Sequence, residues 1–153
     1  MYKNKLISSI AIPKRKERLP VLALVFIYYS MTYYIFRYWN TTLLNLLQPY
    51  LSFLFAGLIL LLLLTLITLK WKISIHAASI AALTGGVTAL TFIAQPVINL
   101  KQIFLINAVL LIFIGMVSFS RMYLKAHSVT QILAGISLGF SLVFSLVFNQ
   151  FYI

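Results

Sequence analysis

An arginine and a histidine stand six positions apart near the end of a largely apolar chain. They are Arg121 and His127, in the segment SRMYLKAHSVTQILAG at 120–135. The other histidine of the chain is His76, in the segment ISIH at 73–76. Histidine changes its charge near neutral pH, and it can act as a base, an acid or a nucleophile. The two histidines are therefore candidates for proton transfer or nucleophilic attack.

The scarcity of acidic residues and the lack of cysteine exclude several other kinds of site. Glu17 is the one carboxylate side chain among 153 residues, and there is no cysteine. Hydrolysis by paired carboxylates, and Mg²⁺ or Ca²⁺ sites built from protein oxygens, need more acidic groups than this. Disulfides, thiolate nucleophiles and cysteine-ligated metals need cysteine. These exclusions leave the two histidines as the main candidates.

The composition of the whole chain predicts a membrane protein. Apolar residues make up 63% of it and charged residues 8%, which is unlike a soluble domain. Several apolar runs have the length of a transmembrane helix, about 20 residues. The formal charge is +11, and membrane phosphates are the simplest partner for it. No zinc-finger spacing or RNA-binding signature indicates a nucleic-acid partner.

We expect an all-α fold, a bundle of about five transmembrane spans. The basic segment 1–18 is predicted to lie at the membrane interface, and 19–153 to form the embedded domain. Small residues in the third and fifth spans, in HAASIAALTGG and GISLG, predict close helix packing. The spans are predicted at roughly 19–38, 49–69, 74–94, 102–119 and 127–148.

An odd number of spans puts the N-terminal segment and two of the turns on one side of the membrane, called side A here. Both histidines fall on side A, with ten of the twelve basic residues: Lys3, Lys5, Lys14, Arg15, Lys16, Arg18, Lys70, Lys72, Arg121 and Lys125. Arg37 and Lys101 fall on side B. This excess is typical of a cytoplasmic side A. Without Arg121 and the basic group of 14–18, the count is five against two, which leaves the orientation open.

The segment at 120–135 resembles the signature S-R-x5-H-x3-D-[V/I]-x2-G of the type-2 phosphatidic acid phosphatase superfamily. That superfamily includes lipid phosphate phosphatases, undecaprenyl pyrophosphate phosphatases and vanadium haloperoxidases. Gln131 stands where the family has aspartate. The residues that match in register are Ser120, Arg121, His127, Ile132 and Gly135.

Two further motifs of the family have counterparts upstream. The segment ISIH keeps the serine and histidine of the family motif P-S-G-H as Ser74 and His76. The segment KRKERLP at 14–20 is similar to the family's first motif, a lysine followed by six residues and Arg-Pro, with Lys14, Arg15, Lys16 and Arg18 as candidates. The resemblance covers 14–139, and it implies the family's six-helix core with the first helix lacking or truncated.

The resemblance implies phosphoryl transfer without a metal or a cofactor. His127 would attack phosphorus through Nε2 and form a phosphohistidine, which water later cleaves. His76 would protonate the leaving oxygen and then activate the water. Arg121 and the basic group of 14–18 would hold the phosphate oxygens, and the helix start at 74–76 would add an amide donor.

Gln131 is expected one helical turn after His127, where its carbonyl oxygen would accept the Nδ1 proton. Ser74, Ser120 and Gln131 complete the predicted substrate-binding set. Glutamine brings no charge to stabilise the protonated imidazole, whereas the family's aspartate does. Glu17, beside the basic group, is the one carboxylate that could substitute for it.

The favoured function is hydrolysis of a phosphomonoester or diphosphate on a lipid or polyprenyl carrier, by a multi-pass protein of a bacterial cell membrane. The first alternative is a member of the same fold with weakened turnover that binds anionic lipid or a partner protein, which the neutral Gln131 favours. The second is a small transporter or scramblase subunit. It would need polar residues along the middle of the spans, where serines, threonines and Asn107 are only scattered. Close family members usually carry the site on the outer or lumenal face, so its side stays open.

Overall fold

Five helices make up the part of the chain that the computed structural model describes, residues 15–38, 44–93 and 99–151 with most of their side chains. They are α1 (Arg15–Tyr38), α2 (Leu44–Lys70), α3 (Ile75–Ile93), α4 (Leu100–Tyr123) and α5 (Val129–Phe148). No strand occurs among these described residues. All five helices are long and apolar enough to cross a membrane. The prediction of an all-α fold with five such helices is confirmed.

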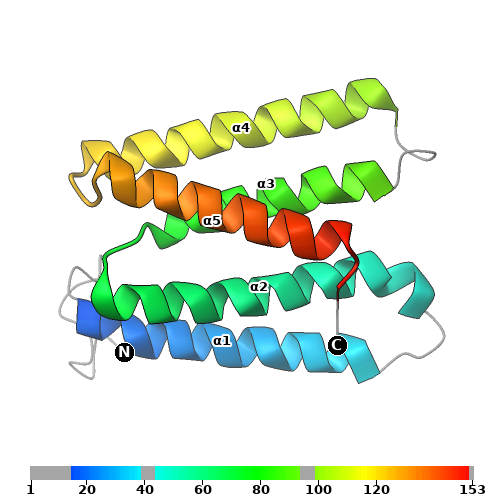
Figure 1. The fold of residues 1–153 in the computed structure, drawn as a ribbon, viewed down its shortest axis with the longest axis horizontal. Coiled ribbons are helices and arrows are strands. Elements are labelled where there is room, and N and C mark those ends of the chain that lie inside the picture. The colour runs from blue at the N-terminus through cyan, green and yellow to red at the C-terminus, as the bar shows by residue number, and fades with distance from the viewer. Residues whose placement is uncertain (1–14, 39–43, 94–98, 152–153) are drawn as a thin grey trace.

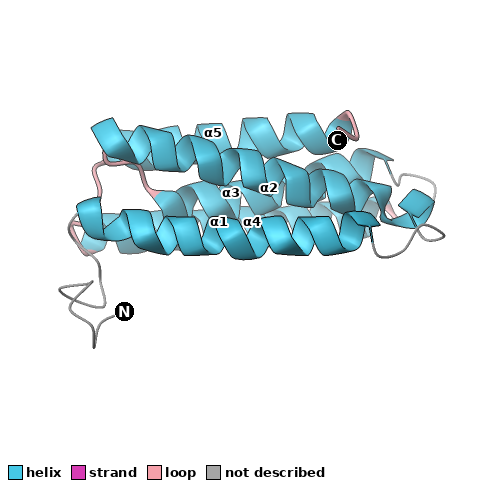
Figure 2. Cartoon of the chain, turned by 90° about the horizontal axis from the view of Figure 1, so that it is seen from below, coloured by secondary structure: helices cyan, strands magenta, loops and turns pink. Residues whose placement is uncertain are grey.

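The helices run side by side and alternate in direction, so their ends gather in two sets (Figure 1). One set holds the starts of α1, α3 and α5 and the ends of α2 and α4. We call it the histidine end, because His76 lies in the first turn of α3 and His127 lies just before α5. Figure 2 shows α5 on one side of α3, and α1 and α4 on the other. α1 packs on α2, and α4 packs mainly on α3.

The tightest contact in the bundle is between α3 and α5, and glycines make it possible. A Cβ atom at Gly139 would collide with the Ala78 carbonyl, and one at Gly135 would lie 2.7 Å from the Ser74 carbonyl oxygen. The same holds for a glycine of α3: a Cβ at Gly85 would lie 2.5 Å from the Phe140 carbonyl oxygen of α5. Small residues at such positions let two backbones approach closely. The close packing predicted from the small residues of α3 and α5 is confirmed.

α4 is attached more loosely than α5. None of its residues from Lys101 to Tyr123 is buried, and Phe104 is 77% exposed. A polar contact holds the helix to α3 at mid-length, where the Thr88 hydroxyl lies 2.6 Å from Asn107 Oδ1. Asn107 therefore joins two helices and does not line a polar path between them.

Several helix boundaries differ from the prediction. α1 begins at Arg15, inside the segment predicted to lie at the interface and before the predicted start at 19. α2 begins at Leu44, before the predicted start at Pro49. A proline at the sixth helical position removes one hydrogen bond, because the first four N–H groups have no partner within the helix. α4 extends past the predicted end at 119 to Tyr123, with Arg121 in its last turn, where a cation complements the helix dipole. α5 begins at Val129, so His127 precedes the helix and does not lie in its first turn.

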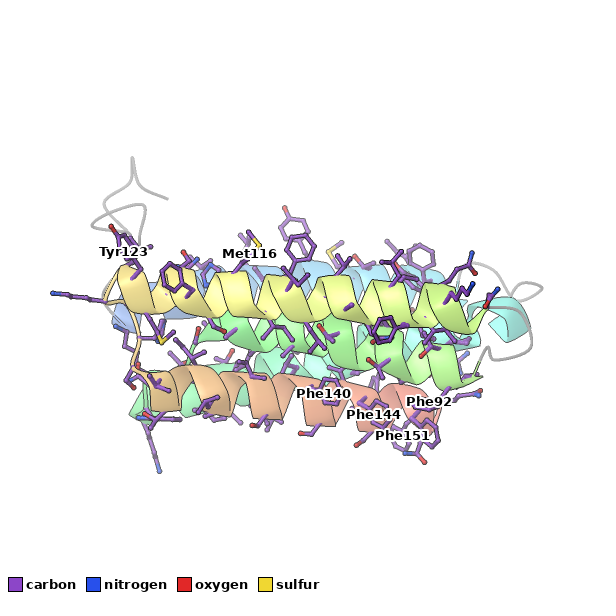
Figure 3. The ribbon with its side chains drawn as sticks, turned by 90° about the horizontal axis from the view of Figure 1, so that it is seen from above. Phe92, Met116, Tyr123, Phe140, Phe144 and Phe151 are labelled. Carbon is purple, nitrogen blue, oxygen red and sulfur yellow. The ribbon has the colours of Figure 1, made fainter. Side chains whose placement is uncertain are left out.

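The end opposite the histidines is aromatic. The rings of Phe140 and Phe144 are stacked with centroids 5.8 Å apart, and Phe92 meets Phe144 edge-on at 6.2 Å. Figure 3 shows Phe92, Phe144 and Phe151 gathered toward that end, with Phe140 nearer the middle of α5, whereas Met116 and Tyr123 on α4 point away from the bundle. Aromatic rings supply much apolar contact area, so this end is held by side-chain packing. The histidine end is held by the hydrogen bonds described next.

Candidate functional site

The turn between α4 and α5 draws Arg121 and His127 together. The Arg121 carbonyl accepts hydrogen bonds from the N–H groups of Ala126 at 3.0 Å and His127 at 3.4 Å. Lys125 reverses the chain with a φ of 49°, a left-handed conformation that costs an L-residue roughly 1–2 kcal/mol. The backbones of Arg121 and His127 are thus held adjacent at the histidine end.

The start of α5 fixes how the Gln131 amide is turned. Ser128 is the N-cap, and its hydroxyl accepts the Gln131 N–H at 3.4 Å. Gln131 Oε1 in turn accepts the Ser128 N–H at 3.3 Å. These two bonds form a capping box. A backbone N–H can only donate, so the glutamine must present its oxygen, not its NH₂ group, to this corner of the structure.

That orientation sets the tautomer of His127. The Nδ1 atom lies 3.2 Å from Gln131 Oε1. Because a carbonyl oxygen only accepts, Nδ1 carries the proton in the neutral ring and Nε2 carries the lone pair. The contact expected between these two side chains is present. The nitrogen that the family resemblance assigns to attack on phosphorus is the one left nucleophilic.

Ser74 joins the start of α3 to the start of α5. Its N–H donates to the Gln131 carbonyl at 3.3 Å, and its hydroxyl accepts the Ala77 N–H at 3.4 Å. The side chain is fully buried. Ser74 was predicted to bind substrate, but both of these polar groups make bonds within the fold. Its role in the structure is to bring the His76 and His127 segments together.

The inner face of α4 carries two buried polar atoms that have no hydrogen-bond partner among the described residues, Arg121 Nε and Ser118 Oγ. Both residues are partly buried, whereas Ser120 is exposed. They lie three positions apart, so their side chains are on the same face of the helix. An unsatisfied buried donor costs about 1–3 kcal/mol and marks a place where a ligand or water can bind. Ser118 was not among the predicted site residues, although its spacing from Arg121 in the sequence could have indicated it.

His76 lies on a different face of α3 from the residues that touch α5. It is two positions before Ala78, which packs against Gly139, so it leaves the helix about 200° around from that contact. The imidazole is exposed and lines a recess of about 450 Å³ with Val117 of α4. Neither His127 nor Arg121 lines this recess. The two histidines thus share one end of the bundle without lining one hollow.

The predicted basic group lies at the edge of the described chain. Arg15, Lys16 and Arg18 are in the first turn of α1, at the histidine end, and their side chains lie outside the described residues, as do Lys14 and the Glu17 side chain. Lys70 ends α2 at the same end of the bundle. Among the described residues, no three His, Cys, Asp or Glu side chains gather into a group that could hold a metal ion.

Comparison of the chain with protein-family models, with curated proteins and with solved structures gives no match.

Proposed function

We propose that the protein crosses a membrane five times and hydrolyses a phosphomonoester or diphosphate on a lipid or polyprenyl carrier at its histidine end. The five apolar helices support insertion, as do the exposed apolar side chains of α4, since such a surface suits lipid. The resemblance of 120–135 to the phosphatase signature supports the chemistry. The observation that carries the proposed hydrolysis is the contact between His127 Nδ1 and Gln131 Oε1.

We place the phosphate at the histidine end, beside the inner face of α4 and the start of α5. Arg121 Nε and Ser118 Oγ are unsatisfied donors on that face, and both suit phosphate oxygens. His127 Nε2 forms a bond to phosphorus while the bond to the leaving oxygen breaks. His76 lies at the same end but on another face of α3, in the recess with Val117, so the proposal requires its side chain to turn toward the phosphate. It then gives the leaving oxygen its proton and later takes one from the water that cleaves the phosphohistidine.

The second candidate function is binding of an anionic lipid without turnover. Two observations favour it. Gln131 brings no negative charge to an imidazole that becomes positive during the reaction. His76 leaves α3 on the face opposite α5. Under this alternative, the unsatisfied donors of α4 hold the headgroup, and His127 is a further hydrogen-bonding group.

Phosphate release by the purified protein distinguishes the two functions. The substrates are a panel of lipid phosphates and polyprenyl diphosphates, tested without added metal, and the variants are His127→Ala and Gln131→Asp. The phosphatase proposal predicts release that His127→Ala abolishes, with phosphate trapped on His127 in the wild type. Release that appears only in Gln131→Asp, with an inert wild type, would establish the binding function instead.

A further inference from the structure

Two hollows share a wall on α3. One is the recess beside His76. The other is an apolar groove of about 320 Å³ that is lined by residues of α1, α2 and α3 and by Val143 of α5. Ser79 and Leu83 line both hollows. Because they share these two residues, the recess with the exposed imidazole and the groove are adjacent along α3.

The groove has the length of one membrane leaflet. On α2 its lining runs from Phe53 to Leu64, a distance of about 16 Å at a rise of about 1.5 Å per residue. The hydrocarbon core of a bilayer is about 30 Å thick, so half of it is about 15 Å. The groove volume of about 320 Å³ is near the lower limit of small-molecule pockets, about 300–1,000 Å³. These dimensions suit a single extended chain.

The walls of the groove are apolar and built around two aromatic rings that rest on glycines. A Cβ atom at Gly57 would lie 2.6 Å from a ring carbon of Tyr29, and one at Gly86 would collide with the Phe53 ring. The rings can lie back against α2 and α3 only because those positions lack side chains. The one serine of the wall, Ser79, donates its hydroxyl to the Ile75 carbonyl at 3.0 Å. The wall therefore offers little to a polar ligand.

We infer that the recess and the groove form one path, which binds one hydrocarbon chain of the lipid whose phosphate meets the histidine end, an inference that rests on the proposed function. Val117, in the recess wall, is one helical turn before Arg121 on α4, so the two lie on the same helix face. The headgroup would lie at Arg121, and the chain would pass His76 and Ser79 into the groove. Lipids with one narrow chain, such as alkyl or prenyl phosphates, fit this path.

Photolabelling with hexadecyl phosphate that carries a diazirine at mid-chain tests the inference in detergent-purified full-length protein. We expect adducts on the α2 and α3 peptides that line the groove. Ser79→Phe fills the shared wall from an exposed position. Excluding even two methylenes should weaken labelling by about tenfold. Ser141→Phe is the matched control, because Ser141 is also exposed and also donates to the carbonyl four residues earlier.

The same experiment on His127→Ala separates the inference from the proposed function. Groove labelling that persists in this variant supports the chain path even where phosphate release fails. Adducts confined to the outer face of α4, or labelling that Ser79→Phe and Ser141→Phe leave equal, would overturn the inference. Excess unlabelled hexadecyl phosphate should compete for the groove, whereas inorganic phosphate, which lacks a chain, should not remove the labelling.

Discussion

The two sides of α3 are built differently. Toward α5, glycines bring the backbones into contact, and Ser74 donates a hydrogen bond to the Gln131 carbonyl. On its other faces, α3 lines two hollows, one shared with α4 and the other shared with α1, α2 and Val143 of α5. His127 lies next to the close contact between α3 and α5, which we call the tight side, and His76 lines a hollow next to α4, which we call the open side.

We expect the two sides of α3 to have different roles. Under the proposed function, His127 needs a fixed ring orientation, which the capping box of α5 and its close packing on α3 would supply. A lipid substrate would need a way in from the bilayer, and the hollows beside α1 and α4 would give space for it. The predictions below test the two sides separately.

Gly139→Leu should have the largest effect, because its side chain would meet the Ala78 carbonyl. Over-packing a tight contact costs about 1–3 kcal/mol and more where backbone must move. We expect a lower thermal midpoint in detergent, or no folded protein. Gly115→Leu is the matched control, since no atom lies within 4 Å of a Cβ at Gly115. Equal midpoints for the two variants would show that the α3–α5 contact is not tight.

Gln131→Ala should be next in size. It removes the acceptor that holds the His127 tautomer. Partners that orient a metal-bound imidazole are each worth about 10–100-fold, and we expect a similar loss in phosphate release. Gln131→Glu keeps the reach to the Ser128 N–H and adds a charge, so it should raise the rate above that of the wild type. A lower rate in Gln131→Glu than in Gln131→Ala would contradict the orienting role.

Asn107→Leu tests the open side. It removes the hydrogen bond between α3 and α4 at Thr88, and such bonds between membrane helices average about 0.6 kcal/mol. The expected result is a small decrease in the thermal midpoint with faster hydrogen exchange in α4. An unchanged α4 exchange rate would show that packing alone holds this helix.

Lys125→Gly should have the smallest effect. Glycine adopts the left-handed conformation of this turn without strain, but it also has more freedom in the unfolded chain, so the variant should be stabilised by only about 0.5 kcal/mol. Chemical denaturation in detergent measures it. Lys125→Ala controls for the loss of charge and should show no such gain. A gain shared by both variants would assign the effect to the charge.

Much of the fold could be predicted because continuous apolar runs and small residues act locally. The spans and the close approach of GISLG to α3 follow from patterns within single segments. The contact of Gln131 with His127 follows from spacing along one helix start. The start of α2 was predicted too late, because Pro49 suggests a boundary although a helix tolerates proline near its beginning.

The arrangement of the site depends on contacts between segments far apart in the sequence, which motifs do not encode. The bonds of Ser74 to Ala77 and Gln131 appear only when α3 and α5 are placed together. The direction of His76 depends on which face of α3 meets α5. Ser118 was missed because its spacing from Arg121 is common among serines of such spans, and only the structure shows that its hydroxyl is buried without a partner among the described residues.

The most direct test of the account is a search for phosphate bound covalently to His127. Purified protein is mixed with a ³²P-labelled lipid phosphate, quenched in alkali, where phosphohistidine survives, and digested for peptide mapping. The account predicts label on the peptide that contains His127, and none on that peptide in His127→Ala. Phosphate release without label at His127, or release that His127→Ala leaves unchanged, would contradict it.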